Sequence, residues 1–250
     1  MRSSSIPLVV AAFTTSIAAA GFVPAVSFSD LDEWRSAAGL PGGSDPSANL
    51  FSSWSTSERI ENFSSVTTSG VGVPYVSVSN GTSANWWQWT ATSGSPVGGV
   101  SIGSGPGTGD NADGQYIYST PTGNALVFSF TGANNSEGGF RSGLRGIGGG
   151  FRFFSASGAP VSGRLILTIS NGDSVVRNFN SADAFAGFWL TDEHTVITSL
   201  RLEPFGNTMG SYFIGAHTLY LGYAGTPIPA PGAVALLGAA GLIGVTRRRG

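Results

Sequence analysis

The chain has 250 residues, no cysteine and no lysine, and a formal net charge of −2, with 12 arginines against 14 acidic residues. The absence of cysteine excludes a disulfide framework, a thiolate metal site and a cysteine nucleophile. The slightly acidic balance argues against nucleic acid as a partner.

The first 20 residues have the pattern of a secretory signal peptide. Arg2 forms a minimal basic region, an apolar run extends from Ile6 to Phe13, and Ala18-Ala19-Ala20 fits an Ala-x-Ala cleavage site. This order of basic, apolar and small residues is typical of export signals. We predict cleavage after Ala20, which removes residues 1–20 from the mature protein.

Residues 21–226 are predicted to form one folded domain that opens with a short helix. Asp30 is placed as the N-cap, Glu33 follows it at the capping-box spacing, and Gly39 is placed as the C-cap. Leu31 and Trp34 would hold this helix against the rest of the domain. Two loops are predicted after it, at 41–49 and 94–114.

The rest of the domain is predicted to be all-β. Apolar and polar residues alternate without a helical period, which indicates strands, and Asn171-Gly172 between two such runs is typical of a tight hairpin. Short strands separated by turn residues predict an antiparallel β-sandwich, and we favour a jelly-roll-like order. The predicted strands cover 71–79, 85–90, 115–118, 125–130, 147–154, 163–170, 173–177, 185–190, 195–203 and 212–223.

Three tryptophans crowd one predicted strand. Alternation places Trp87 and Trp89 on one face and Trp86 on the other. Exposed indoles would form a platform on which the sugar rings of extracellular polysaccharide stack, and the domain would then be a carbohydrate-binding module. Buried indoles would fill the core, where aromatic side chains contribute most. Both interpretations stay open at this point.

Acidic residues offer two weaker candidates for a site. Asp110 and Asp113 present oxygen ligands suited to Ca²⁺ on a glycine-flanked loop, although the EF-hand spacing is missing and a polar turn explains the same residues. Glu58, Glu61 and Glu137 would be the acids of a glycosidase, yet some pair among 14 acids is expected to lie close by chance. We predict no metal site from these residues.

His194 and His217 are the only histidines. No Gly-x-Ser-x-Gly elbow follows a predicted strand to complete a triad with His194 and Asp192, and no zinc-binding spacing joins the two histidines. We therefore expect a solvated turn at His194 and a structural role for His217 at a break between two short strands. The prediction is a protein that is not an enzyme and carries no cofactor.

The last segment, 227–250, combines a proline spacer, an apolar stretch and an arginine cluster. Pro227, Pro229 and Pro231 prevent a helix in the spacer. The 15 residues from 232 to 246 are uncharged and would span about 22 Å as a helix. This is short against a hydrocarbon core of about 30 Å, so that the span depends on arginine snorkelling or local thinning. We predict a single C-terminal transmembrane helix with a cytoplasmic terminus.

This three-part tail resembles the PEP-CTERM sorting signal of bacterial exosortase substrates. The resemblance implies that Pro229-Ala230-Pro231 is the recognition tripeptide, with Ala230 where the family pattern has Glu, and that Arg247, Arg248 and Arg249 form the stop. It implies an exosortase-type processing enzyme as a partner, which cleaves near the motif. It also implies transient contact with the inner membrane before the protein reaches the cell surface or the extracellular matrix.

The sequence thus predicts an exported, non-enzymatic surface or matrix protein with a structural or adhesive role. A carbohydrate-binding module that uses Trp86, Trp87 and Trp89 is the alternative, and a secreted hydrolase is a third hypothesis. Removal of both predicted end segments would leave 8 arginines and 14 acidic residues, a net charge of −6.

Overall fold

The computed structural model describes the body of the chain between Ala25 and Gly225, with gaps. The signal-peptide cleavage site, the sorting motif at 229–231 and the arginines at 247–249 lie outside the described part. No helix within the described part is long and apolar enough to cross a membrane. The described residues are 25–63, 75–80, 87–95, 98–103, 116–131, 134–137, 140–180, 184–192, 195–205 and 212–225.

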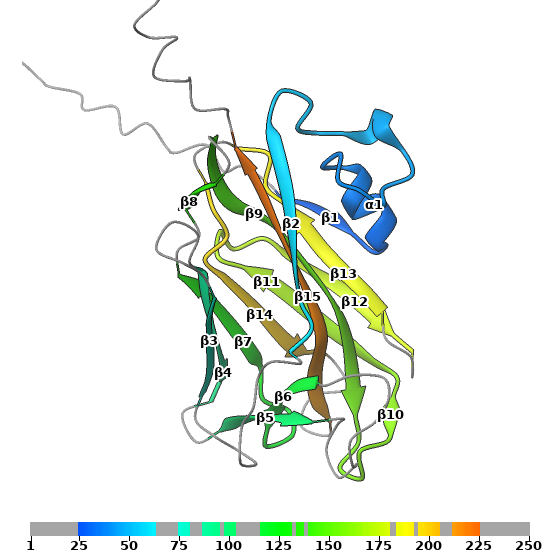
Figure 1. Cartoon of the computed structure of the whole chain (residues 1–250). Coiled ribbons are helices and arrows are strands. Elements are labelled where there is room, and N and C mark those ends of the chain that lie inside the picture. Colours follow the sequence, from blue (N-terminus) through cyan, green and yellow to red (C-terminus); the bar gives the residue numbers. More distant parts are fainter. Residues whose placement is uncertain are drawn as a thin grey trace, which may run out of the picture.

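The described residues form two β-sheets and two short helical segments (Figure 1). Sheet A contains β1 (Val26–Phe28), β2 (Ser55–Glu61), β5 (Gly99–Gly103), β6 (Tyr116–Thr120), β8 (Asn134–Glu137), β9 (Phe140–Phe154), β10 (Pro160–Val161), β13 (Ala184–Trp189) and β15 (Phe213–Gly225). Sheet B contains β3 (Tyr75–Asn80), β4 (Trp87–Ser93), β7 (Leu126–Thr131), β11 (Gly163–Ile169), β12 (Ser174–Phe179) and β14 (Ser199–Pro204). The helical segments are α1 (Leu31–Ser36) and the 3₁₀ turn η1 (Pro46–Ala48).

The strand order brings the last strands of the chain into the middle of both sheets. Sheet A follows β1-β13-β9-β15-β6-β5, with β2 also beside β15 and with β8 and β10 beside β9. Sheet B follows β12-β11-β14-β7-β4-β3. All pairings among these strands are antiparallel. The antiparallel sandwich with one short N-terminal helix is confirmed. The jelly-roll-like order stays a prediction.

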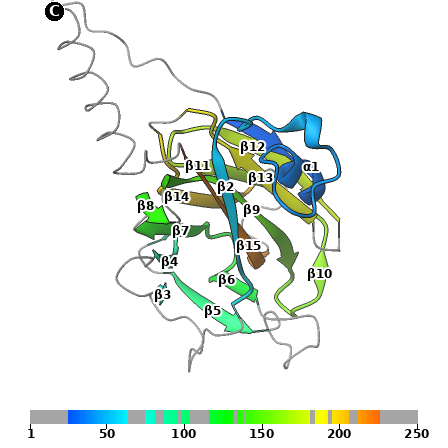
Figure 2. The same ribbon diagram turned by 45° about the horizontal axis from the view of Figure 1, so that its top comes forward.

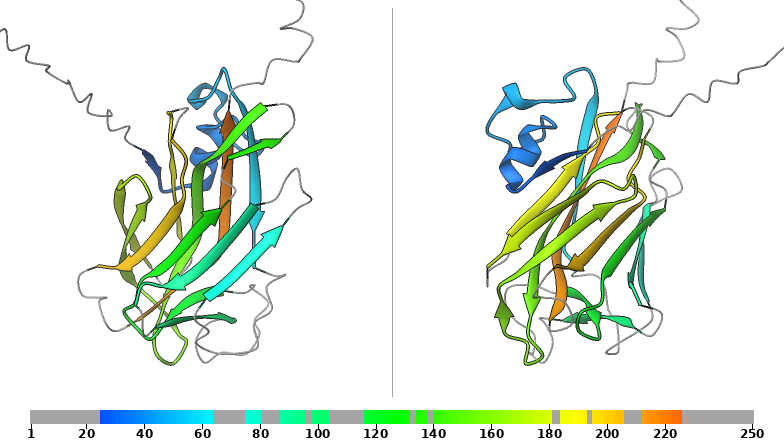
Figure 3. Two further views of the ribbon diagram at one scale, coloured as in Figure 1. Left: turned by 90° about the vertical axis from the view of Figure 1, so that its left-hand side faces the viewer. Right: turned by 180° about the vertical axis from the view of Figure 1, so that it is seen from behind.

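One hydrophobic core lies between the two sheets, which the side and rear views show as two layers (Figure 3). Along β11 the side chains of Leu165, Leu167 and Ile169 are buried and those between them are more exposed. This is the period-2 pattern of a strand with one face on a core. Sheet A contributes buried side chains such as Phe151 and Leu221 to the same cluster.

The structure differs from the predicted elements at several places, including the following three. The strand β5 lies inside the predicted loop 94–114 and pairs with β6, and β2 lies where no strand was predicted. β2 was missed because its sequence is polar and charged and lacks apolar alternation. β5 was missed because its short Val100-Ser101-Ile102 alternation lies in a Gly-rich stretch that indicated a loop. The predicted break at His217 is wrong, because β15 is continuous there and only its register against β9 shifts, between Ala216 and Thr218.

The helix α1 begins as predicted and ends earlier. The carboxylate of Asp30 accepts hydrogen bonds from the backbone N–H groups of Asp32 and Glu33 at 2.8 and 3.1 Å, which confirms the N-cap. The C-cap is Ala37 and not Gly39. Gly39 has φ +61° in the turn that follows. Figure 2 shows α1 and η1 on one side of the molecule, at the end away from β5 and β6.

Candidate functional site

The outer face of sheet A carries a cluster of aromatic rings beneath α1, which we call the indole cluster (Trp34, Phe51, Trp54 and Trp189). The indoles of Trp34 and Trp189 stack with centroids 4.8 Å apart. Each indole N–H donates to a backbone carbonyl across the contact, Trp34 to Phe188 at 3.1 Å and Trp189 to Trp34 at 2.9 Å. These paired hydrogen bonds fix the helix on the sheet.

Glycines in the sheet make room for this cluster. A Cβ atom on Gly146 of β9 would lie 2.6 Å from the ring of Trp189, and one on Gly222 of β15 would overlap the same ring. On β13, a Cβ on Gly187 would lie 2.9 Å from Trp34. The two indoles thus pack directly on the backbone of three adjacent strands, and this close approach requires glycine at these positions. We call these three glycines the glycine bed.

An ion pair joins the helix to β2 beside the cluster. Arg35 Nε and Nη2 donate to the carboxylate of Glu58 at 3.0 to 3.2 Å, and the two side chains are 20% and 12% exposed. The guanidinium of Arg35 also lies 5.4 Å from the ring centroid of Tyr220 on β15. Burial raises the pKa of Tyr220 above its usual value, Arg35 lowers it, and Glu58 raises it.

Next to the cluster, the same face of sheet A contains a hollow of about 230 Å³, which we call the Gly150 hollow. Its floor is the backbone of β9 at Gly150, where a Cβ atom would meet nothing within 4 Å. Gly150 pairs with Phe185 of β13 on one side and with Thr218 of β15 on the other. The hollow is lined by Leu31, Gly150, Ala184, Phe185, His217, Thr218 and Tyr220.

The walls of the Gly150 hollow combine aromatic faces with a few polar groups. Phe185 and Tyr220 meet edge to face with centroids 5.9 Å apart. At the other end, the hydroxyl of Thr218 lies 3.0 Å from Nδ1 of His217, and the imidazole contacts the ring of Tyr116 with a centroid separation of 5.1 Å. None of the lining residues is an acid, an arginine or a lysine. Such a lining suits an uncharged ligand with an apolar face.

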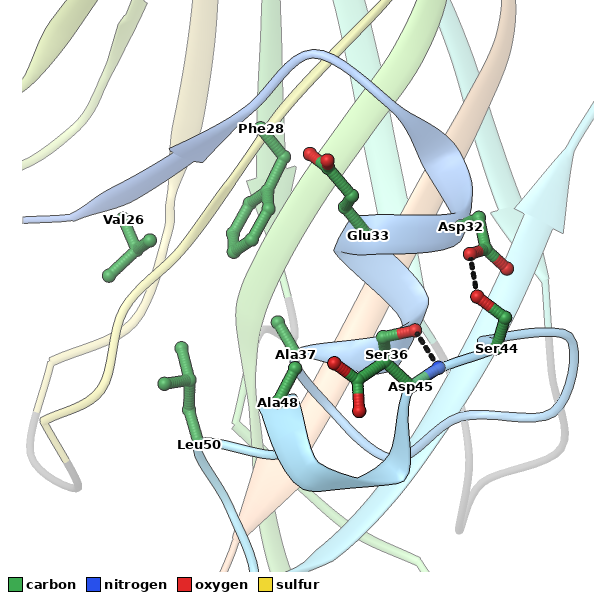
Figure 4. Close-up of a pocket in the computed structure, with 10 residues that line it drawn as sticks. All are labelled: Val26, Phe28, Asp32, Glu33, Ser36, Ala37, Ser44, Asp45, Ala48 and Leu50. Atoms are coloured by element: carbon green, nitrogen blue, oxygen red, sulfur yellow. Dashed lines mark hydrogen bonds between the residues drawn. The ribbon is translucent and has the colours of Figure 1, made fainter.

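A larger groove of about 480 Å³ lies between α1, η1 and β1 (Figure 4). Its apolar side includes Val26 and Leu50, which are 40% and 45% exposed. Two of its acidic residues have local hydrogen-bond partners, since Asp32 accepts from the Ser44 hydroxyl and Asp45 accepts from Ser47. Those bonds to Ser47 hold the pKa of Asp45 below its usual value. The carboxylates thus brace the loop after α1.

Trp89, one of the three predicted platform residues, lies in the core. It is fully buried, meets Phe63 and Phe128 edge to face, and donates from Nε1 to Glu61 at 3.2 Å. The platform prediction is therefore wrong for Trp89, because the side of β4 that carries it faces inward. Trp86 and the side chain of Trp87 lie outside the described residues.

Other candidate residues have structural partners where they are described. Glu58 pairs with Arg35, whereas Glu61 is buried and accepts from the backbone of Phe63 at 2.7 Å as well as from Trp89. This burial removes Glu61 from the surface on which a glycosidase would need a second acid. The side chain of Glu137 and all of His194 lie outside the described part.

The described residues contain no group of three or more His, Cys, Asp or Glu side chains that could hold a metal ion. Asp110 and Asp113, the weak calcium candidates, lie outside the described part. The calcium hypothesis at that loop stays a prediction.

Comparison with known proteins identifies no family. No protein-family model matches the chain, and no curated protein matches it. Among solved structures, a family two carbohydrate esterase from Cellvibrio japonicus is similar at a TM-score of 0.25 and 15% identity over 58% of this chain and 36% of its own. The enzymatically active domain of bacteriophage CBA120 tailspike protein 4 is similar at a TM-score of 0.27 and 12% identity over 69% of this chain and 20% of its own. At these TM-scores neither likeness carries an argument about function.

The Gly150 hollow was missed by the sequence analysis, which treated His217 as structural and Gly148 to Gly150 as the start of a strand. The run of three glycines in the middle of a β-strand was the available signal, because such a run weakens the strand and marks a close approach of another group. Phe185 and Tyr220 carry no such signal, since their faces depend on the pairing of β13 and β15 with β9.

Proposed function

We propose that this chain is an exported, non-enzymatic β-sandwich with a structural or adhesive role at the cell surface or in the extracellular matrix. Its C-terminal segment 227–250 would act as a PEP-CTERM-like sorting signal that an exosortase-type enzyme processes. One observation carries the proposal: the sandwich uses the chain up to Gly225, and the spacer, apolar stretch and arginine cluster follow at once.

The organisation of the body is compatible with such processing. The last strand, β15, pairs with β9 and β2 up to Ala224 and Gly225, and Nε of Arg145 donates to the carbonyl of Ala224 at 2.9 Å. Cleavage near Pro231 would leave these contacts intact. The described acids Glu58 and Glu61 are engaged in structural contacts, which favours a role other than hydrolysis for them.

Mass spectrometry of the protein recovered from the cell surface or medium tests the sorting proposal. We expect a new N-terminus at Gly21 and a C-terminus close to Pro231, with Arg247 to Arg249 missing. The surface-exposed form with an intact Arg249 would contradict processing. A variant with Pro229 and Pro231 both replaced by Ala should keep its tail and stay with the membrane fraction, whereas replacement of Pro227 alone serves as the matched control.

A carbohydrate-binding role stays the alternative for the body. Since Trp89 is buried, this role needs a surface other than the predicted tryptophan platform.

A further inference from the structure

We propose that the Gly150 hollow is a binding subsite for one uncharged pyranose ring of an extracellular polysaccharide. This subsite would give the adhesive role proposed above a ligand. It rests on that role only for the statement that the sugar comes from extracellular polysaccharide. The position, shape and chemistry of the hollow each support it.

The hollow exists because one outward-facing glycine of β9 has no neighbour above it. A Cβ on Gly148 would lie 2.5 Å from Phe185, and one on Gly146 would lie 2.6 Å from Trp189, so side chains already occupy those positions. At Gly150 the corresponding space is open. Its volume of about 230 Å³ is below the range of roughly 300 to 1,000 Å³ for sites of drug-sized ligands. It therefore suits a single ring of a longer chain.

The aromatic walls of the hollow are held in place before any ligand binds. Trp34 contacts both Phe185 and Tyr220 with centroid separations of 6.3 Å. The guanidinium of Arg35 covers Tyr220 and is itself held by Glu58. Rings fixed in this way need little ordering on binding, which reduces the entropic cost of association.

The chemistry of the lining selects the class of ligand. Phe185 and Tyr220 offer apolar surface for the C–H face of a sugar ring, while the Thr218 hydroxyl, which lies 3.0 Å from Nδ1 of His217, places a polar group near the floor. A uronate or amino sugar would place a charge in a site whose lining has no acid, arginine or lysine, and an unpaired charge is costly to desolvate. The combination favours a neutral sugar.

Binding to the purified full chain tests the proposal. The probes are the methyl glycosides of glucose, galactose and mannose, N-acetylglucosamine, the charged methyl glucuronide, and phenol as a purely aromatic ligand. Ligand-observed NMR and calorimetry should show saturable binding of at least one neutral sugar, with a Kd on the order of 1 mM, and much weaker binding of the glucuronide. Failure of every neutral sugar to bind overturns the proposal, as does binding of phenol alone.

A matched pair of glycine variants locates the binding. Gly150→Val places a strand-compatible side chain in the open hollow and should lower the affinity at least tenfold. Gly103→Val, at a glycine of β5 that also has open space around it, should bind as the wild type does. Equal affinity of the Gly150→Val variant and the wild type overturns the proposal.

Thr218→Val is a second variant for the case in which Gly150→Val does not fold. It removes one hydroxyl from the floor and should weaken sugar binding several-fold with little change of shape, and undiminished binding contradicts the subsite. These measurements need no processed tail, so that a failure here leaves the sorting proposal untouched. An intact Arg249 on surface protein would likewise leave the sugar subsite untouched.

Discussion

The outer face of sheet A uses glycine in two opposite ways. Over Gly146, the absence of a side chain lets the indole of Trp189 descend onto the sheet, and α1 covers the result. Over Gly150, four residues further along the same strand, the absence of a side chain leaves open space. The same residue type therefore marks a filled contact at one position and a candidate binding site at the other. The side chains that the neighbouring strands place over each glycine determine whether the space is filled or open.

The largest expected loss of stability comes from removing the indole of Trp189, which fills the space over Gly146. Trp189→Ala deletes a fully buried indole that stacks on Trp34 and contacts Phe51. We expect a loss of about 3 to 5 kcal/mol in the free energy of unfolding, as for other large-to-small core changes. Urea denaturation measures it, and a loss below about 1 kcal/mol would show that the indole cluster contributes little.

Gly146→Ala should be the next most damaging change. Its Cβ would lie 2.6 Å from three atoms of the Trp189 ring, so that the indole or the strand must move, at a cost of roughly 1 to 3 kcal/mol. Differential scanning calorimetry measures the resulting fall in Tm. An unchanged Tm would mean that the indole shifts freely and that the glycine bed is not required.

Loss of the ion pair between α1 and β2 should have a smaller effect. Glu58→Gln removes the negative charge that holds Arg35 over Tyr220, and we expect a loss of about 1 kcal/mol, because the pair is bidentate but partly exposed. Urea denaturation at low and high salt checks the electrostatic origin. Glu203→Gln is the matched control, since its pair with Arg201 is more exposed, at 38% and 40%. Equal losses in both variants would contradict the special role of Glu58.

Two tyrosines, Tyr220 in the wall of the Gly150 hollow and Tyr118 on β6, should make the stability of the fold depend on alkaline pH. Burial raises the pKa of both Tyr220 and Tyr118 above the usual tyrosine value of 10.0, and a hydrogen bond with Ser101 partly offsets the rise at Tyr118. Since the folded state favours the neutral phenols, their contribution to stability is complete below pH 10 and is lost as the pH rises through the raised values. Phenolate absorbance during an alkaline titration should show two late-titrating groups, one of which disappears in Tyr118→Phe.

The smallest effect is expected at the open glycine. Gly150→Ala places a methyl group in empty space and reduces the freedom of the unfolded chain, so that stability should stay the same or rise by up to about 1 kcal/mol. Gly146→Ala should lower the stability and Gly150→Ala should keep or raise it, although both glycines lie on β9. This difference tests the comparison most directly. A destabilised Gly150→Ala variant would mean that the hollow is closed in solution.

Local signals predicted much of this fold, and long-range pairing explains the rest. The N-cap at Asp30 and the hairpin around Asn171-Gly172 depend on neighbouring residues, and both are present, with φ of +95° at Gly172. Charged β2 is a strand because Leu219 to Gly225 lie beside it. No sequence pattern within β2 contains that information.

The candidate site was less predictable than the fold. The inward position of Trp89 follows from the placement of β4 against a core that sheet A completes. The tryptophans were the visible signal in the sequence, whereas the hollow is built from a glycine and from rings on strands that are distant in sequence. In the sequence, the tryptophan cluster around Trp89 thus indicated a part of the core, whereas a glycine, Gly150, was the only sign of the surface hollow.

The central positions of β14 and β15 impose an order on folding. Until the last strand arrives, β9 has no partner along one edge, and β2 and β6 have no strand to join them to the sheet. Such long-range pairing is slow, and unpaired edges promote aggregation while they persist. With no cysteine to lock a partly folded intermediate, the unpaired strand edges stay open to aggregation until nearly the whole sandwich has been made. Its yield in a foreign host should therefore depend on chaperone supply more than on the stability of the finished sandwich.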